Sequence, residues 1–204
     1  MPISQERQYR DMSQMMTLIP TERKKKIDTS YYVEGYATTF DEPYLLFEFD
    51  GVKYYEQIDR KAFKNADMSD VIFQYNHMGR VYARQSNGTL GLEVDKHGLF
   101  TYADLSKTEG AKDLYGDIAA GMITKMSWAF TESERSFNRE TNTWTVLKVR
   151  KVYDVSAVSL PANPDTEISA RALLDGVIEE AAHREAMKRR IQILKIKTLL
   201  EEIR

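Results

Sequence analysis

The chain of 204 residues has no cysteine, only five prolines and three histidines, and no long apolar run. The absence of cysteine excludes a disulfide scaffold, a thiol nucleophile and thiolate metal ligands, and it suits a reducing compartment. No stretch approaches the ~18 consecutive apolar residues that a membrane-spanning helix requires. Residues 1–17 are polar and lack the apolar segment of a secretion signal. We therefore expect a protein of the cytoplasm without a membrane partner.

The rest of the composition is that of a folded protein. Hydrophobic residues make up 42% and aromatic residues 11% of the chain, which argues against intrinsic disorder. A chain of this length suits one domain of ordinary size with extensions. The formal net charge is only -2, so no overall basic field indicates a nucleic-acid partner.

The sequence divides into three regions. Residues 1–29 show no clear periodicity and are interpreted as an N-terminal extension, in which the basic run at 23–26 is either a solvated tether or a weak electrostatic docking site. Residues 30–165 are rich in aromatic and β-branched segments and hold the domain. Residues 166–204 favour a long helix with apolar residues at helical spacing. A helix of this kind at a chain end is more typical of oligomerisation or partner binding than of a compact core. We therefore expect a homo-oligomer, of which a dimer is one form.

The pattern within residues 30–165 predicts many strands and few helices. Asp50-Gly51 and Asn87-Gly88 each separate two β-rich segments and predict hairpins. One helix is expected over residues 108–120, ending at Gly121, and a single helical turn over residues 58–64. The expected strands cover residues 31–37, 45–49, 52–55, 71–75, 81–85, 89–94, 99–105, 125–131, 144–149 and 152–160. This content predicts a β-rich α+β fold.

Two of these strands carry residues that could act as a base and a nucleophile. His77 follows the apolar strand at 71–75, and Ser127 lies within the strand at 125–131. A serine is a poor nucleophile until an adjacent imidazole accepts its proton. The alternative is a hydrogen-bonded core histidine and an ordinary strand serine, and their spacing alone favours this alternative.

A carboxylate and a helix–strand junction add to the pair. Strand alternation places Val152, Asp154, Ser156 and Val158 on one face, and an ionised Asp154 in this apolar strand needs a partner such as a histidine N–H. The alternative is a solvated carboxylate, or one paired with a neighbouring basic residue at 150 or 151. The junction that begins at Gly121 could hold backbone N–H groups near the serine for a tetrahedral oxyanion, although it could also be a plain connection.

Eight short segments between residues 30 and 171 resemble, in order, the elements of one known family. They are Glu34–Ala37, Glu56–Phe63, Tyr75–His77, Gly88–Leu90, Gly98-Leu99, Gly121–Phe130, Asp154–Ala162 and Arg171. The family is that of the serine proteases that mature the proheads of tailed bacteriophages, which are distant relatives of the herpesvirus assembly protease. Two residues depart from the family pattern, because Trp128 replaces the commoner Phe and Asp154 replaces the commoner Glu.

The resemblance implies a serine endopeptidase with a herpesvirus-protease-like β-barrel flanked by helices. Ser127 would attack the scissile carbonyl, His77 would act as general base and then acid, and Asp154 would orient His77. Herpesvirus relatives use a second histidine as the third member, so His97 stays an alternative to Asp154, whereas His183 is expected on the surface of the terminal helix. The resemblance implies no metal or cofactor.

By resemblance, the substrates are scaffolding protein or the scaffold-like arm of the major capsid protein inside an assembling shell in the host cytoplasm, and the protease would also process itself. Two other classes remain. One is a non-catalytic scaffold or assembly module in which the helical arm binds capsid components. The other is a β-rich binding module, which predicts that a change at Ser127 leaves function unaltered.

Overall fold

The computed structural model describes residues 8–15 and 24–159. These residues form ten strands, one α-helix and one 3₁₀ helix. The elements are β1 (Gln8–Met15), β2 (Tyr32–Thr39), β3 (Tyr44–Phe49), β4 (Val52–Ile58), β5 (Ile72–Tyr75), β6 (Met78–Arg84), η1 (Gln85–Asn87), β7 (Leu90–Val94), β8 (Gly98–Asp104), α1 (Glu109–Ala119), β9 (Lys125–Asn138) and β10 (Thr143–Val158). The expected C-terminal helical arm lies outside the described residues. No helix among the described residues is long and apolar enough to span a membrane.

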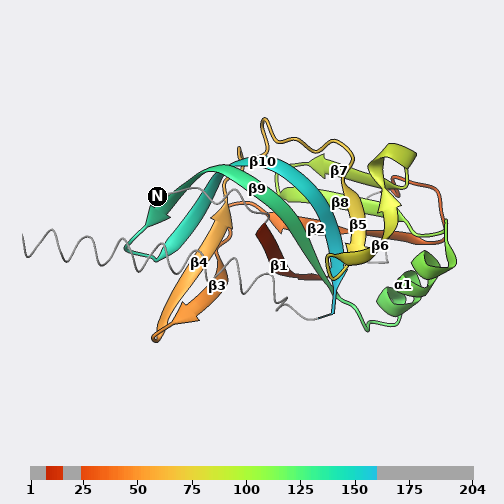
Figure 1. Ribbon diagram of the computed structural model, residues 1–204, viewed down its shortest axis with the longest axis horizontal. Helices are drawn as coiled ribbons and strands as arrows, with labels where there is room; N and C mark the ends of the chain where they lie inside the picture. Colours follow the sequence, from red (N-terminus) through yellow and green to blue (C-terminus); the bar gives the residue numbers. More distant parts are fainter. Residues whose placement is uncertain (1–7, 16–23, 160–204) are drawn as a thin grey trace, which may run out of the picture.

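The strands form two sheets. The larger has seven strands in the order β1-β9-β10-β4-β3, with β5 pairing with β10 and β6 with β5. The smaller has the order β2-β8-β7. Figure 1 shows β9 and β10 as long curved ribbons that cross the molecule, with the β3–β4 hairpin and α1 toward opposite ends. The sheets therefore supply the framework, and the single helix lies at one end of it.

The longest strand, β10, connects most of the larger sheet. It pairs antiparallel with β9 from Thr143 to Val158. On its other edge it pairs parallel with β4 through residues 143–146 and with β5 through residues 154–157. Because β5 and β9 flank the same end of β10, residues that are far apart in the sequence meet there.

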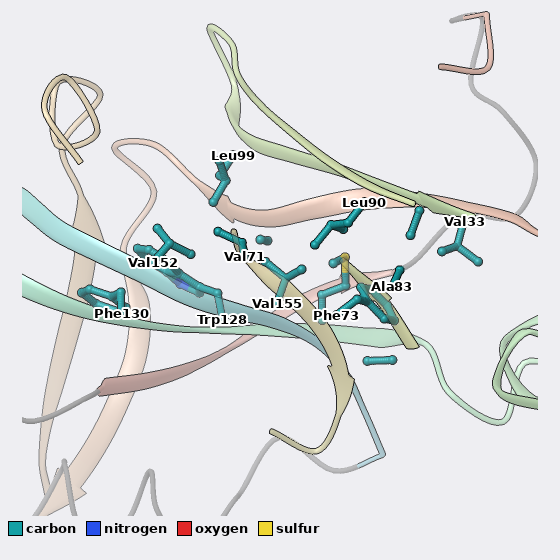
Figure 2. Packing of buried hydrophobic residues seen from close by; sticks show 14 of the residues in the cluster. Val33, Val71, Phe73, Ala83, Leu90, Leu99, Trp128, Phe130, Val152 and Val155 are labelled. Carbon is teal, nitrogen blue, oxygen red and sulfur yellow. The ribbon is translucent and has the colours of Figure 1, made fainter. Parts of the chain in front are cut away.

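The hydrophobic core lies between the two sheets. Figure 2 shows Val33, Leu90 and Leu99 of the smaller sheet facing side chains of the larger sheet and of the segment that leads into β5. The residues on that opposite side include Val71, Phe73 and Val155, all 0% exposed. Burial of this many aliphatic and aromatic side chains is the main term that stabilises the domain.

The prediction of a β-rich α+β content is confirmed, but the barrel is wrong for the described residues. The strands leave separate edges, at β1, β3 and β6 in the larger sheet and at β2 and β7 in the smaller. Strands β9 and β10 also extend to 14 and 16 residues, where shorter segments were expected. Register shifts let β10 bend while it stays paired with β9, so two expected strands become one continuous strand.

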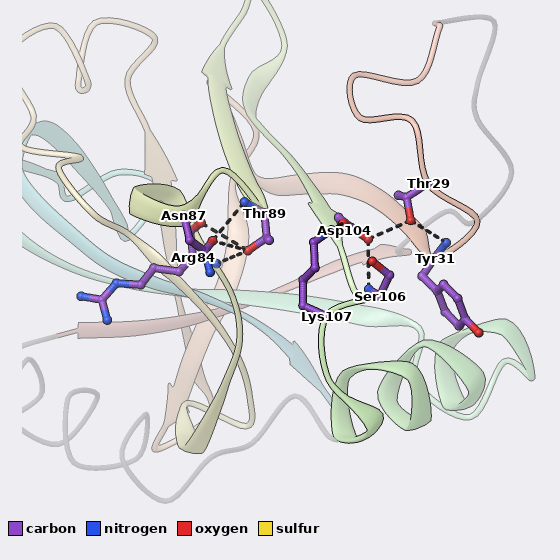
Figure 3. Close-up of polar contacts among 8 residues, drawn as sticks. All are labelled: Thr29, Tyr31, Arg84, Asn87, Thr89, Asp104, Ser106 and Lys107. Carbon is purple, nitrogen blue, oxygen red and sulfur yellow. Dashed lines mark hydrogen bonds and ion pairs between the residues drawn. The ribbon is translucent and has the colours of Figure 1, made fainter.

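The two predicted hairpins had different outcomes. Asp50 and Gly51 both have positive φ, 50° and 72°, which is the conformation of a two-residue hairpin turn between β3 and β4. The second hairpin is wrong. The Asn87 side chain accepts hydrogen bonds from the backbone N–H and hydroxyl of Thr89 (Figure 3), and η1 carries the chain from one sheet to the other. Strand β6 pairs with β5, whereas β7 pairs with β8.

The predicted helix is confirmed, whereas the expected helical turn at 58–64 is wrong. Thr108 caps α1 by accepting a hydrogen bond from the Ala111 N–H, and Gly121 ends the helix at φ 72°. The N–H groups of Gly121 and Met122 donate to the carbonyls of Ile118 and Asp117, which is the Schellman pattern. Residues 59–64 form successive tight turns in place of a helix.

Candidate active site

His77 lies in a two-residue turn between β5 and β6. Tyr75 pairs with Met78, and the two residues between them, Asn76 and His77, have φ of 49° and 56°. Positive φ at both central positions closes a tight hairpin, and Asn and His enter this region more readily than most residues. The Asn76 N–H donates to the Ala157 carbonyl at 3.0 Å, so the turn is fixed against the end of β10.

Ser127 occupies the third position of β9. Its neighbours Met126 and Trp128 are 0% exposed and belong to the core, where Trp128 stacks on Phe130 at 3.9 Å between ring centroids. Successive side chains of a strand point to opposite faces. The core packing of Met126 and Trp128 therefore directs Ser127 to the other face of the larger sheet.

A register shift brings Asp154 to that same face. Val152 pairs with Phe130 and belongs to the core, whereas Asp154 pairs with Ala129, so one extra residue on β10 lies between these two pairs. The extra residue reverses the alternation, because a regular strand would keep Val152 and Asp154 on one face. The prediction that these two side chains share a face is therefore wrong, and the shift is what aims Asp154 at the histidine.

The three side chains form a continuous hydrogen-bonded chain. His77 Nε2 lies 2.5 Å from Ser127 Oγ, and His77 Nδ1 lies 2.5 Å from Asp154 Oδ1. The side chains of His77 and Asp154 are 0% and 1% exposed, and Ser127 is 0% exposed. When Nδ1–H donates to the carboxylate, Nε2 is left as the acceptor for the serine hydroxyl. This arrangement can remove the serine proton during nucleophilic attack.

The other candidates from the sequence lie elsewhere. The ring of His97 packs edge-on against Tyr36, with 4.4 Å between centroids, in the turn that joins β7 and β8. Lys151 forms its ion pair with Asp67 at 2.8 Å and does not take the position beside Asp154. His183 lies outside the described residues. The position at His77 Nδ1 is thus filled by Asp154.

Ser156 has a place in the site that the sequence pattern did not indicate. Its hydroxyl donates to Asp154 Oδ1 at 2.9 Å and accepts the His77 backbone N–H at 3.3 Å. The available signal was alternation, since a residue two positions after Asp154 lies on the same face. What the sequence could not supply was the position of the His77 backbone beside that face.

Charged pairs hold the segment that leads into β5. A hydrogen bond from Lys151 holds the pKa of Asp67 well below its usual range, and the Arg84 guanidinium does the same for Asp70. Asp67 also exchanges backbone hydrogen bonds with Arg150 and Val152 of β10. Both ion pairs are partly exposed, so each contributes little to the free energy of folding. Their main effect is to fix the position of this segment against β10 and β6.

Comparison with known proteins gives one match. No curated protein and no solved structure matches the chain, so the expected likeness to the herpesvirus assembly protease stays a prediction. A family model described as the caudovirus prohead serine protease matches residues 19–181, well over half of the chain. That range contains Ser127, His77 and Asp154, whose side chains form the hydrogen-bonded series described above. This protein therefore belongs to the caudovirus prohead serine proteases, the serine peptidases of phage head maturation.

Proposed function

We propose that Ser127, His77 and Asp154 are the catalytic triad of an endopeptidase that cleaves proteins of the assembling phage head. Ser127 Oγ attacks the scissile carbonyl while its proton passes to His77 Nε2. The same proton then goes to the leaving amine, and water hydrolyses the acyl-enzyme by the reverse sequence of transfers. Asp154 accepts the Nδ1–H, which fixes the tautomer and stabilises the imidazolium that forms.

The observation that carries this proposal is the unbroken series Ser127 Oγ, His77 Nε2, His77 Nδ1 and Asp154 Oδ1, with 2.5 Å at both steps. A structural histidine would satisfy its two ring nitrogens with any available partners. Here one nitrogen faces a hydroxyl and the other faces a buried carboxylate, which is the order that the reaction requires. The membership in a serine protease family supports the same assignment.

The tetrahedral intermediate needs backbone donors for its oxyanion. The N–H groups of Gly121 and Met122 cap α1 and are therefore committed. We assign the donors to the part of the junction beyond Met122, which leads directly into the strand that holds Ser127. The sequence indicated the whole junction from Gly121 onward as the source of these donors, and this assignment leaves only the part after Met122.

The family membership supports a proposal for the substrates. A prohead protease acts on capsid or scaffold proteins, so scaffolding protein or the scaffold-like arm of the major capsid protein is the proposed substrate, together with the protease itself. The site of action is the assembling prohead in the host cytoplasm, where the chain works as a homo-oligomer. The family membership argues against a non-catalytic assembly module or binding module.

The direct test uses the wild-type protein and Ser127→Ala. Each is incubated alone and with the scaffolding and major capsid proteins of the same phage, and fragment masses are recorded. Wild-type protein should cut at defined positions, and Ser127→Ala should give no fragments. A fluorophosphonate, which phosphonylates activated serines, should label residue 127 of the wild-type protein. Equal cleavage by Ser127→Ala would refute the assignment.

A further inference from the structure

Ser156 lies in the middle of the three proposed triad residues. It pairs directly with Ser127 across β9 and β10, and it is two residues from Asp154 on the same face of β10. It is 0% exposed. Its hydroxyl thus lies among the nucleophile, the carboxylate and the turn that presents the base.

One hydroxyl connects two of these residues. Ser156 Oγ donates to Asp154 Oδ1 at 2.9 Å and accepts the backbone N–H of His77 at 3.3 Å. A serine hydroxyl has one donor and two acceptor sites, so it can make both bonds at once. Asp154 Oδ1 therefore accepts both Ser156 Oγ–H and His77 Nδ1–H.

The second carboxylate oxygen makes this connection more important. Asp154 Oδ2 is buried and has no hydrogen-bond partner in the described part of the chain. A buried carboxylate with few donors is costly and lacks a unique orientation. His77 also has a φ of 56°, which a side-chain-bearing residue keeps only when its surroundings fix it. Ser156 supplies a donor to the other oxygen of this carboxylate and an acceptor for the His77 backbone N–H.

We propose that Ser156 is a positioning residue of the active site, which holds the Asp154 carboxylate and the His77 backbone in register for proton transfer. This inference rests on the proposed triad. Ser156 acts through Asp154 and His77 and does not itself exchange a proton with the substrate. Its loss should slow the reaction while the three triad side chains remain.

The test measures how fast a fluorophosphonate labels Ser127 in the full chain. In this step the Oγ–P bond forms, the P–F bond breaks, fluoride leaves, and the Oγ proton passes to His77 Nε2. Ser156→Ala should lower the labelling rate by roughly tenfold to a hundredfold, the effect of one lost hydrogen bond to a charged group. Ser127→Ala should not be labelled, which separates failure of the triad from failure of Ser156.

A double-mutant cycle distinguishes positioning from a general structural effect. Because Ser156 acts in part through the carboxylate, Ser156→Ala should slow labelling by a clearly smaller factor in Asp154→Asn than in the wild-type protein. A merely structural role would slow both backgrounds by the same factor. Equal factors, or equal rates for Ser156→Ala and the wild-type protein, would overturn the proposal.

A second measurement does not depend on access of the probe to Ser127. The proton that His77 Nδ1 shares with Asp154 should give a low-field resonance in the wild-type protein. In Ser156→Ala this resonance should move upfield or exchange faster with water. An unchanged resonance would overturn the proposal even if the wild-type protein were not labelled, whereas absent labelling alone would count against the triad.

Thr131→Val is the matched control. Like Ser156, Thr131 has a buried hydroxyl in the larger sheet, here on β9. Its Oγ1 has no hydrogen-bond partner within the residues that the structure describes. Its removal should leave the labelling rate and the His77 resonance unchanged. A change equal to that of Ser156→Ala would show that any buried hydroxyl in this sheet has the same effect, and would contradict the proposal.

Discussion

The backbone N–H of Ser159 donates to Asn76 Oδ1 at 3.1 Å, so the residue beside His77 is joined to the end of β10. Asn76 Nδ2 in turn donates to Ser159 Oγ at 3.2 Å. The side-chain amide of Asn76 therefore fixes the turn that contains His77 to the segment just after β10. This relationship makes Asn76 a test of how far the turn geometry controls the site.

Asn76→Ala should slow the labelling of Ser127 clearly, whereas it should lower the thermal unfolding temperature only slightly. The change removes the amide and places a less tolerant residue at φ 49°. Asn76→Gly removes the same amide but tolerates positive φ. We expect Gly to recover part of the rate that Ala loses, measured by fluorophosphonate labelling alongside thermal unfolding. Identical rates for both variants would mean that the amide alone is responsible.

Asp154→Asn should reduce the rate by about 10³- to 10⁴-fold, because the amide cannot hold the tautomer that accepts the serine proton. His97→Ala should keep nearly all activity, since that ring packs on Tyr36 in a surface turn. Cleavage of the capsid substrates and labelling of Ser127 both measure this. The opposite result, with His97 essential and Asp154 dispensable, would favour the arrangement of the herpesvirus relatives.

The part of the site that the sequence could predict came from local signals. His77 follows a strand of four residues, and Ser127 sits within a run whose neighbours are core residues, so both positions follow from the pattern. The register shift between Val152 and Asp154 does not, because a bulge is defined only by the partner strand. The role of Ser156 was hidden for the same reason.

The same limit applies to the fold. Asn87-Gly88 has the composition of a hairpin turn, but the Asn87 side chain bonds to Thr89 and the chain changes sheet. Strand β1 has no clear sequence periodicity, and its backbone pairs with the edge that β9 offers. Local propensity thus gave the positions of most elements, whereas tertiary pairing decided which strands became neighbours.

Asp104 should make stability depend on pH. Burial raises the pKa of this carboxyl, but hydrogen bonds from Ser106, Thr29 and Lys107 outweigh burial and lower the pKa (Figure 3). A lowered folded-state pKa stabilises the protein above the unfolded value of about 3.9, and this stabilisation is lost as pH falls through the folded value.

Asp104→Asn should therefore cost about 1–2 kcal/mol of unfolding free energy at pH 7. The difference from the wild-type protein should shrink below about pH 4, measured by denaturant unfolding at several pH values. Glu109→Gln is the control, since Glu109 is 86% exposed and forms a surface pair with Lys112. A cost for Asp104→Asn that does not vary with pH would contradict this explanation.

A chain that ends at Arg171 tests the predicted C-terminal arm. An amphipathic helix gains little stability alone and needs a partner face for its apolar stripe. If that partner is a second copy or a scaffold protein, the shortened chain should melt cooperatively at an unchanged temperature and still label at Ser127. Where the partner is a second copy, the oligomeric state measured by light scattering should also fall. Aggregation or loss of the cooperative transition would instead make the arm part of the domain.

The N-terminal strand offers the last test. The backbone of β1 pairs antiparallel with β9, with Asp11 opposite Ser127, and so fills the edge of the strand that holds the nucleophile. Proteins often bind an extended peptide by adding it to such an edge. We expect a chain that begins at residue 24 to fold, since strands β2 to β10 remain in the two sheets, and to label at Ser127 faster because the edge is open. Asp11→Pro in the full chain should act in the same direction, because proline cannot donate to the ladder.

Met122→Ala, a change at an exposed residue away from this edge, is the control and should leave the rate unaltered. A slower rate or loss of cooperative unfolding in the shortened chain would mean that β1 completes the sheet, and that the N-terminal boundary of the domain precedes residue 8.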